Sequence, residues 1–110
     1  MWKSVPAVTY DNYDEVISDS EKPVLIDFWA PWCHPCRTME PVLGELVDTM
    51  KDKLNFAKVN IDLYHDIAEK FSVRSIPTLL LVKNNNEVLR LNAGKYTLSH
   101  LDELLGDHLN

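Results

Sequence analysis

Residues 24–36 read VLIDFWAPWCHPC, and this stretch decides how the chain folds. Its first seven residues are apolar except for Asp27, a pattern typical of a strand that is buried on both faces. The only two cysteines of the chain, Cys33 and Cys36, follow directly, where the periodicity predicts the start of a helix. We therefore expect the cysteine pair at the carboxyl end of a central strand.

The spacing of the two cysteines favours redox chemistry over a structural role. A disulfide between Cys33 and Cys36 closes a very short loop, so it adds little stability. At the start of a helix, unpaired N–H groups and the positive end of the helix dipole favour the thiolate, which is the form that attacks disulfides. The pair is therefore expected to react with other disulfides.

Other roles for the cysteines are a purely structural disulfide and half of a zinc site. Zinc needs four ligands, and the four histidines offer no second pair at a recognisable spacing, so we predict no metal. Covalent haem requires histidine directly after the second cysteine, where this chain has Arg37.

The remaining sequence alternates strands and helices. Periodicity predicts strands at residues 5–9, 24–30, 56–61, 78–82 and 88–91. It predicts four helices: one with Asp11 as its N-cap, two over residues 34–50 and 64–71, and one that begins near residue 97. Three asparagines at residues 84–86 tolerate positive φ and predict a hairpin turn. We expect one α/β domain over residues 1–110, with a central mixed β-sheet of about four to five strands flanked by about four helices on both faces.

Composition excludes several classes of partner. The 110 residues are 45% hydrophobic and carry a net charge of -6, which repels nucleic acid phosphates and anionic membranes. No segment approaches the ~20 apolar residues of a membrane-spanning helix, and the N-terminus has no signal-peptide pattern. We expect a cytoplasmic monomer with no nucleic acid or membrane partner.

Taken together, these features resemble the thioredoxin family. The matching segments occur in the order and at nearly the spacing of the family, and they are residues 26–36, Pro41, residues 58–62, residues 76–78 and Gly94. The resemblance implies the thioredoxin fold and a thiol-disulfide oxidoreductase, a protein-disulfide reductase that carries electrons and contributes to redox homeostasis. It also implies protein disulfides as substrates, a flavoprotein thioredoxin reductase drawing on NADPH as donor, and no bound cofactor besides the redox-active disulfide of Cys33 and Cys36.

The resemblance also assigns roles to residues of the site. It makes Cys33 the attacking thiol and Cys36 the resolving thiol. It places Asp27 as a buried carboxyl group beneath Cys36, with Lys58 nearby, and it makes the Ile76–Pro77 peptide bond cis. The thiol roles agree with helix geometry, because Cys33 precedes the first turn whereas Cys36 lies one turn in and is shielded.

Asp27 has a physical reason for its role as well. A carboxyl group inside an apolar strand is costly to ionise, so its pKa rises and it can take a proton from Cys36 and return it. The alternative is a carboxylate at a strand edge without a function. Lys58 either pairs with Asp27 or is a solvated lysine.

A substrate-binding surface is expected around the cysteines. Pro77 belongs at a strand start, because it cannot donate to a sheet ladder, and a cis bond would let the backbone of Ile76 pair with an extended substrate. The alternative is an ordinary trans proline in a turn. An apolar patch would hold unfolded or partly open proteins, and its members are Trp32, Ile76, Pro77, Ala93 and Gly94. Trp29 is expected in the core.

His34 is the main departure from the family, which mostly has glycine there. An imidazole beside Cys33 can stabilise the thiolate, so we expect His34, with Pro35, to tune the site toward a reduction potential above the about -270 mV of thioredoxin. The alternative is an exposed imidazole with little effect. A more oxidising site would suit an oxidase or isomerase, and a different class, a non-catalytic binding subunit, would use only the surface around Trp32 and Pro77.

Overall fold

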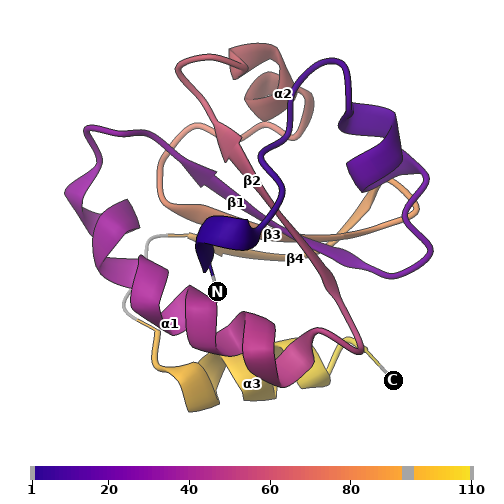
Figure 1. The fold of residues 1–110 in the computed structure, drawn as a ribbon, viewed down its shortest axis with the longest axis vertical. Coiled ribbons are helices and arrows are strands. Elements are labelled where there is room, and N and C mark those ends of the chain that lie inside the picture. Colours follow the sequence, from indigo (N-terminus) through magenta and orange to yellow (C-terminus); the bar gives the residue numbers. More distant parts are fainter. Residues whose placement is uncertain (1, 93–95, 110) are drawn as a thin grey trace.

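The protein, described by a computed structural model for residues 2–92 and 96–109, is built on one mixed β-sheet (Figure 1). The sheet has four strands in the order β2-β1-β3-β4. Their bounds are β1 (Val24–Trp29), β2 (Asn55–Asn60), β3 (Thr78–Lys83) and β4 (Asn86–Asn92). β1 runs parallel to β2 and antiparallel to β3, so the strand that precedes the cysteines is central, as predicted.

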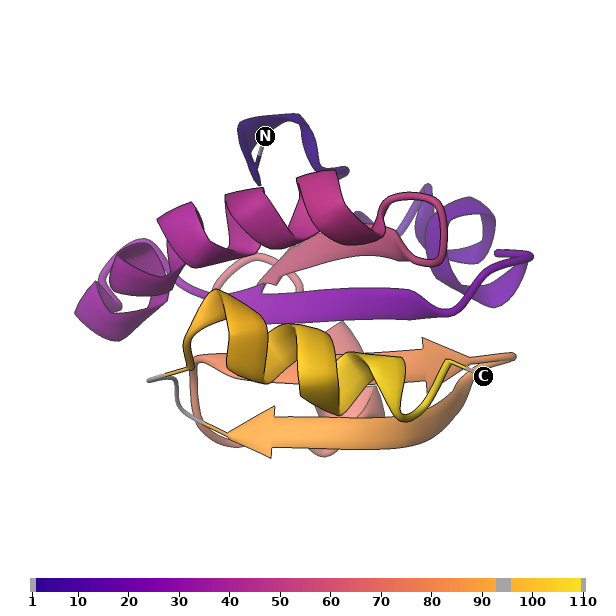
Figure 2. The ribbon, with the colours of Figure 1, turned by 90° about the horizontal axis from the view of Figure 1, so that it is seen from below.

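Helices cover both faces of this sheet. α1 (His34–Met50) and α3 (Leu98–Gly106) lie side by side on one face, while α2 (His65–Lys70) lies on the other (Figures 1 and 2). A short 3-10 helix, η1 (Trp2–Ser4), packs on α1, and a π-helical turn, η2 (Asp14–Ser18), follows it in the chain. The expected α/β architecture is confirmed within the described residues.

Alternating side chains of the strands produce two apolar cores. Leu25, Leu79 and Leu81 pack on one face with α1 and α3, whereas Ile26 and Leu80 pack on the other face with α2. Because both faces of β1 are covered, the strand is apolar at almost every position. The one exception on β1, Asp27, is therefore forced into the interior.

The β3–β4 hairpin turns through two residues with left-handed backbone. Asn84 has φ 54° and Asn85 has φ 65°, and asparagine adopts this region more readily than most residues. The prediction from the asparagine triplet is confirmed.

Two N-terminal predictions are wrong. Residues 5–9 form no strand but a single parallel bridge, in which the Val8 N–H donates to the Lys58 carbonyl at 2.8 Å and the Lys58 N–H donates to the Pro6 carbonyl at 3.0 Å. Pro6 has no N–H with which to extend the ladder.

Asp11 is not a helix N-cap. The Thr9 N–H instead donates to Asn12 Oδ1 at 2.7 Å, and the Asn12 N–H donates to Thr9 Oγ1 at 3.2 Å. This reciprocal pair forms a turn that delays the helix, which begins after Asp11 as η2.

Candidate redox site at the start of helix α1

Cys33 and Cys36 are joined by a disulfide at the junction of β1 and α1. Cys33 is the N-cap residue of α1, with extended backbone, and its Sγ accepts a hydrogen bond from the Cys36 N–H at 3.2 Å. A sulfur in the N-cap position therefore receives one of the free N–H groups of the helix start. The same donor and the helix dipole stabilise negative charge on this sulfur when the disulfide is reduced.

Both cysteines are buried, which differs in part from the expectation. Cys36 is 3% exposed, in agreement with its predicted shielding, but Cys33 is 4% exposed and so hardly more open. Burial of the whole residue does not distinguish the two cysteines, because Trp29, Ile61 and Ile76 pack around both of them. What distinguishes them is their place relative to the first turn of α1.

Asp27 lies inside the protein, as predicted. It is 2% exposed, and its Oδ1 atom has no hydrogen-bond partner within the described residues. The pKa of Asp27 is raised from 3.8 to about 7, mainly by burial; the carboxylate of Glu40 also raises it, and the positive charge of Lys58 lowers it. Near neutral pH this carboxyl group therefore exists in both protonation states.

The two charged residues around Asp27 come from different elements. Lys58 lies opposite Asp27 in the register of β1 and β2, which confirms that it is nearby. Glu40 lies on α1, and no role was predicted for it. Its position four residues after Cys36, on the same face of the predicted helix, was the available signal.

The Ile76–Pro77 peptide bond is cis, as the family resemblance implied. Pro77 is buried directly before β3, and Ile76 packs against the cluster of Ala30, Cys33 and Cys36. A segment forty or more residues from the cysteines in the chain thus forms one wall of the site.

Trp32 is the exposed part of the site. Its side chain is 66% exposed, and its Nε1–H donates to both carboxylate oxygens of Asp62, at 3.0 and 3.2 Å. Asp62 belongs to a matching segment, but no function was predicted for it. Ala93 and Gly94, also predicted to bind substrate, lie outside the described residues.

The remaining predicted residues fall into two groups. Trp29 is half-buried against the cysteine cluster, although its indole nitrogen is buried without a partner within the described residues. His34 and Pro35 occupy the first turn of α1 and are exposed. His34 therefore lies at the positive end of the helix, as its predicted role requires.

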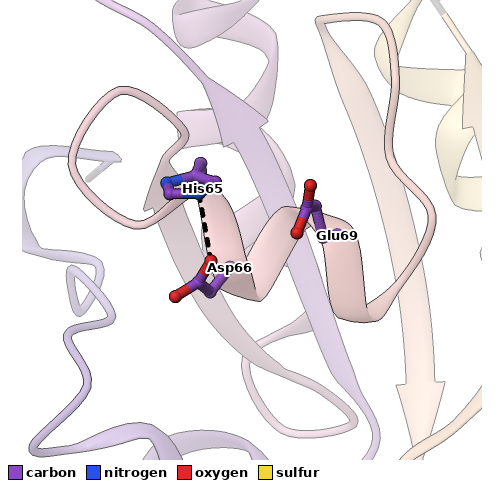
Figure 3. Close-up of side chains that lie close together, drawn as sticks. All are labelled: His65, Asp66 and Glu69. Carbon is purple, nitrogen blue, oxygen red and sulfur yellow. Dashed lines mark ion pairs between the residues drawn. The ribbon is translucent and has the colours of Figure 1, made fainter.

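One cluster of possible metal ligands lies apart from the cysteines. On α2, ligand atoms of His65, Asp66 and Glu69 lie within 4.8 Å of one another, and His65 Nε2 lies 3.0 Å from Asp66 Oδ1 (Figure 3). All three side chains are exposed, and exposed acidic groups commonly gather without an ion. We assign this cluster no metal.

Among the helices of the described residues, none has the length and apolar character needed to cross a bilayer.

Comparisons with known proteins agree with this geometry. The family model "Thioredoxin" matches residues 4–106. The chain is 47% identical over 90 residues to thioredoxin of Bacillus subtilis, covering 82% of this chain and 86% of the relative. It is 39% identical over 98 residues to thioredoxin of Haemophilus influenzae, a match that covers 89% of this chain and 91% of the relative. It is 36% identical over 101 residues to chloroplastic thioredoxin Y1 of Arabidopsis thaliana, where the match covers 92% of this chain but 58% of the relative.

Proposed function

This chain belongs to the thioredoxin family of thiol-disulfide oxidoreductases, and we propose that Cys33 is its attacking thiol and Cys36 its resolving thiol. The observation that carries the proposal is the hydrogen bond from the Cys36 N–H to the Cys33 sulfur at the N-cap of α1. This contact and the helix dipole favour the thiolate of Cys33 over that of Cys36, which lies inside the first turn.

The reaction consists of two exchanges. The Cys33 thiolate attacks one sulfur of a substrate disulfide, whose S–S bond breaks and releases one substrate thiolate, leaving a mixed disulfide. The Cys36 thiolate then attacks the Cys33 sulfur and releases the second substrate thiolate. Two electrons have passed to the substrate, and an external donor restores the dithiol.

Asp27 is proposed to accept the proton that Cys36 must lose before the second exchange. Its support is the pKa of about 7, raised mainly by burial, because a proton acceptor works best when its pKa lies near the working pH. Lys58 would favour the ionised form of Asp27, and Glu40 the neutral form.

The partners and setting follow from the family. We propose protein disulfides as substrates, bound along Trp32 and the Ile76–Pro77 segment, and a flavoprotein thioredoxin reductase using NADPH as donor. The cysteine pair would then be the only redox group. The cytoplasm stays a prediction, since relatives with chloroplastic names occur beside bacterial ones.

A trapping experiment tests the thiol roles. With insulin as the disulfide probe, Cys36→Ser should accumulate a mixed disulfide, seen as a mass increase that dithiothreitol removes, because the second exchange is blocked. Cys33→Ser is the matched control and should accumulate little. The opposite pattern would reverse the two roles.

Two further measurements test the alternatives to a disulfide reductase, namely a non-catalytic binding subunit and an oxidase or isomerase. A non-catalytic binding subunit would keep its cellular activity when both cysteines are serine, whereas an oxidoreductase would lose it. An oxidase or isomerase would equilibrate with glutathione at a clearly more oxidising potential than a reductase.

A further inference from the structure

Two strongly exposed apolar side chains lie next to the same carboxylate. Trp32 is 66% exposed and Leu63 is 65% exposed, whereas the large apolar side chains of the described residues are mostly buried. The Trp32 indole donates to Asp62, and Leu63 directly follows Asp62 in the chain. Leu63 is therefore the chain neighbour of the residue that holds the Trp32 indole, and Trp32 itself precedes Cys33.

The turn that carries Leu63 is fixed by hydrogen bonds. The side-chain oxygen of Asn60 accepts from the Asp62 N–H at 2.9 Å, and the Asn60 carbonyl accepts from the Leu63 N–H at 3.2 Å and the Tyr64 N–H at 2.9 Å. The Tyr64 ring packs edge-on against Tyr10 at 5.0 Å. The exposure of Leu63 is thus built into an ordered turn, so that little entropy is lost when a partner covers it.

The charges around Leu63 are mainly acidic. Asp62 precedes it and Asp66 lies three residues further on, both exposed, and the whole chain carries a net charge of -6. A partner that covers Leu63 is favoured if it brings positive charge.

We propose that Leu63, together with Trp32, binds an apolar side chain close to the reacting cysteine of the substrate, and that the preferred substrate is a disulfide-bonded segment with apolar and basic residues beside that cysteine. This inference rests on the proposed function. It adds a specificity-determining residue that lies outside the cysteine pair and the Ile76–Pro77 segment.

Because the cysteines are buried, the proposed contact between Leu63 and the substrate affects the rate of thiol-disulfide exchange. Cys33 and Cys36 are 4% and 3% exposed, so an attacked disulfide must enter in a narrow range of orientations. A contact that positions the segment near Cys33 raises the fraction of productive encounters.

Model peptides test the proposal. Two peptides of equal length each carry one cysteine in a mixed disulfide with 5-thio-2-nitrobenzoate, and differ only in having Leu–Lys or Ser–Lys beside the cysteine. The protein is first reduced with dithiothreitol, which is then removed, and release of the coloured thiolate gives the second-order rate constant. The dithiol loses two electrons, and the mixed disulfide is reduced to two thiols.

The wild-type protein should react about fivefold faster with the Leu–Lys peptide, and Leu63→Gln should bring the ratio of the two rates close to one. Val88→Gln is the matched control, because Val88 is an exposed apolar residue on β4, and it should keep the wild-type ratio. A ratio of one in the wild type, or an unchanged ratio in Leu63→Gln, overturns the inference. Failure of the proposed function looks different: the wild type would release no thiolate from either peptide.

Discussion

The carboxyl group of Asp27 is buried in a strand whose other residues are apolar, and this placement links the stability of the protein to its chemistry. An acid whose pKa is raised by folding holds its proton more tightly in the folded than in the unfolded state. Its ionisation therefore opposes folding, and the protein loses stability as the pH rises from the unfolded pKa toward the folded one. The group that we propose for proton transfer is also a source of instability at neutral pH.

We predict that Asp27→Asn stabilises the disulfide form at high pH. The pKa rises from 3.8 to about 7, which corresponds to about 4 kcal/mol, so the gain should approach this size at pH 8 and shrink toward zero near pH 4. Urea unfolding at both pH values measures it. An exposed carboxylate, Asp52→Asn, is the control and should show no such pH-dependent gain. Equal gains at both pH values would contradict the assigned pKa.

His34 lies at the start of α1 and, by our prediction, acts on the cysteines. If the imidazole stabilises the Cys33 thiolate, the reduced form is favoured and the potential rises. A stabilisation of about 1.4 kcal/mol corresponds to about 30 mV for this two-electron couple.

His34→Gly should therefore lower the reduction potential by about 30 mV, as measured by equilibration with glutathione. His34→Gln separates the charge from the size of the side chain, and should also lower the potential. If the parent proves more reducing than His34→Gly, the exposed imidazole has no oxidising effect.

Among the elements, α1 has the most direct link to function, because its first turn supplies the donor to the Cys33 sulfur. Pro35 fits in this turn, where its missing N–H costs no hydrogen bond. The turn after β2 adds Asp62 and Leu63, and the segment before β3 adds Ile76 and Pro77. The proposed site thus combines the helix start after β1 with two loops at the ends of β2 and β3, the strands on either side of β1.

The β3–β4 turn permits a test of backbone strain away from the site. Asn84 has φ 54°, a region that costs a β-branched residue about 1–2 kcal/mol. Asn84→Val should therefore destabilise the protein by about this amount in urea unfolding, while Asn84→Gly should change stability little, since glycine adopts positive φ freely. A harmless Asn84→Val would mean that the turn can change its conformation.

At the scale of the whole molecule, two separate cores support the sheet that presents the site. Leu105 on α3 is completely buried in the core that α1 and α3 form on β1, β3 and β4. Leu104, its neighbour, is only partly buried there. These two leucines allow core packing to be tested apart from the chemistry of the cysteines.

Leu105→Ala should lower the free energy of unfolding by about 2–5 kcal/mol, and Leu104→Ala by clearly less. The reduction potential should stay the same in both variants, because α3 contributes no residue to the cysteine cluster. Urea unfolding and glutathione equilibration measure the two quantities. A shifted potential in Leu105→Ala would show that core packing is coupled to the redox site.

Most of the elements could be predicted because their signals are local. Apolar runs and helical periodicity identify β1, α1 and α3 by residue type alone. The prediction failed at residues 5–9 and at Asp11, where Pro6 and the Thr9–Asn12 pair override a weak pattern.

The sequence by itself determined that two cysteines meet a helix start after a buried strand and that Asp27 is enclosed by apolar neighbours, because both follow from residues adjacent in the chain. The family resemblance implied that Lys58 lies near Asp27 and Ile76 near the cysteines, but only the tertiary structure decided that Glu40 acts on Asp27 and that Asp62 holds Trp32. Periodicity shows which face of an element is apolar, but the choice of which distant segments pack together depends on the packing of the whole chain.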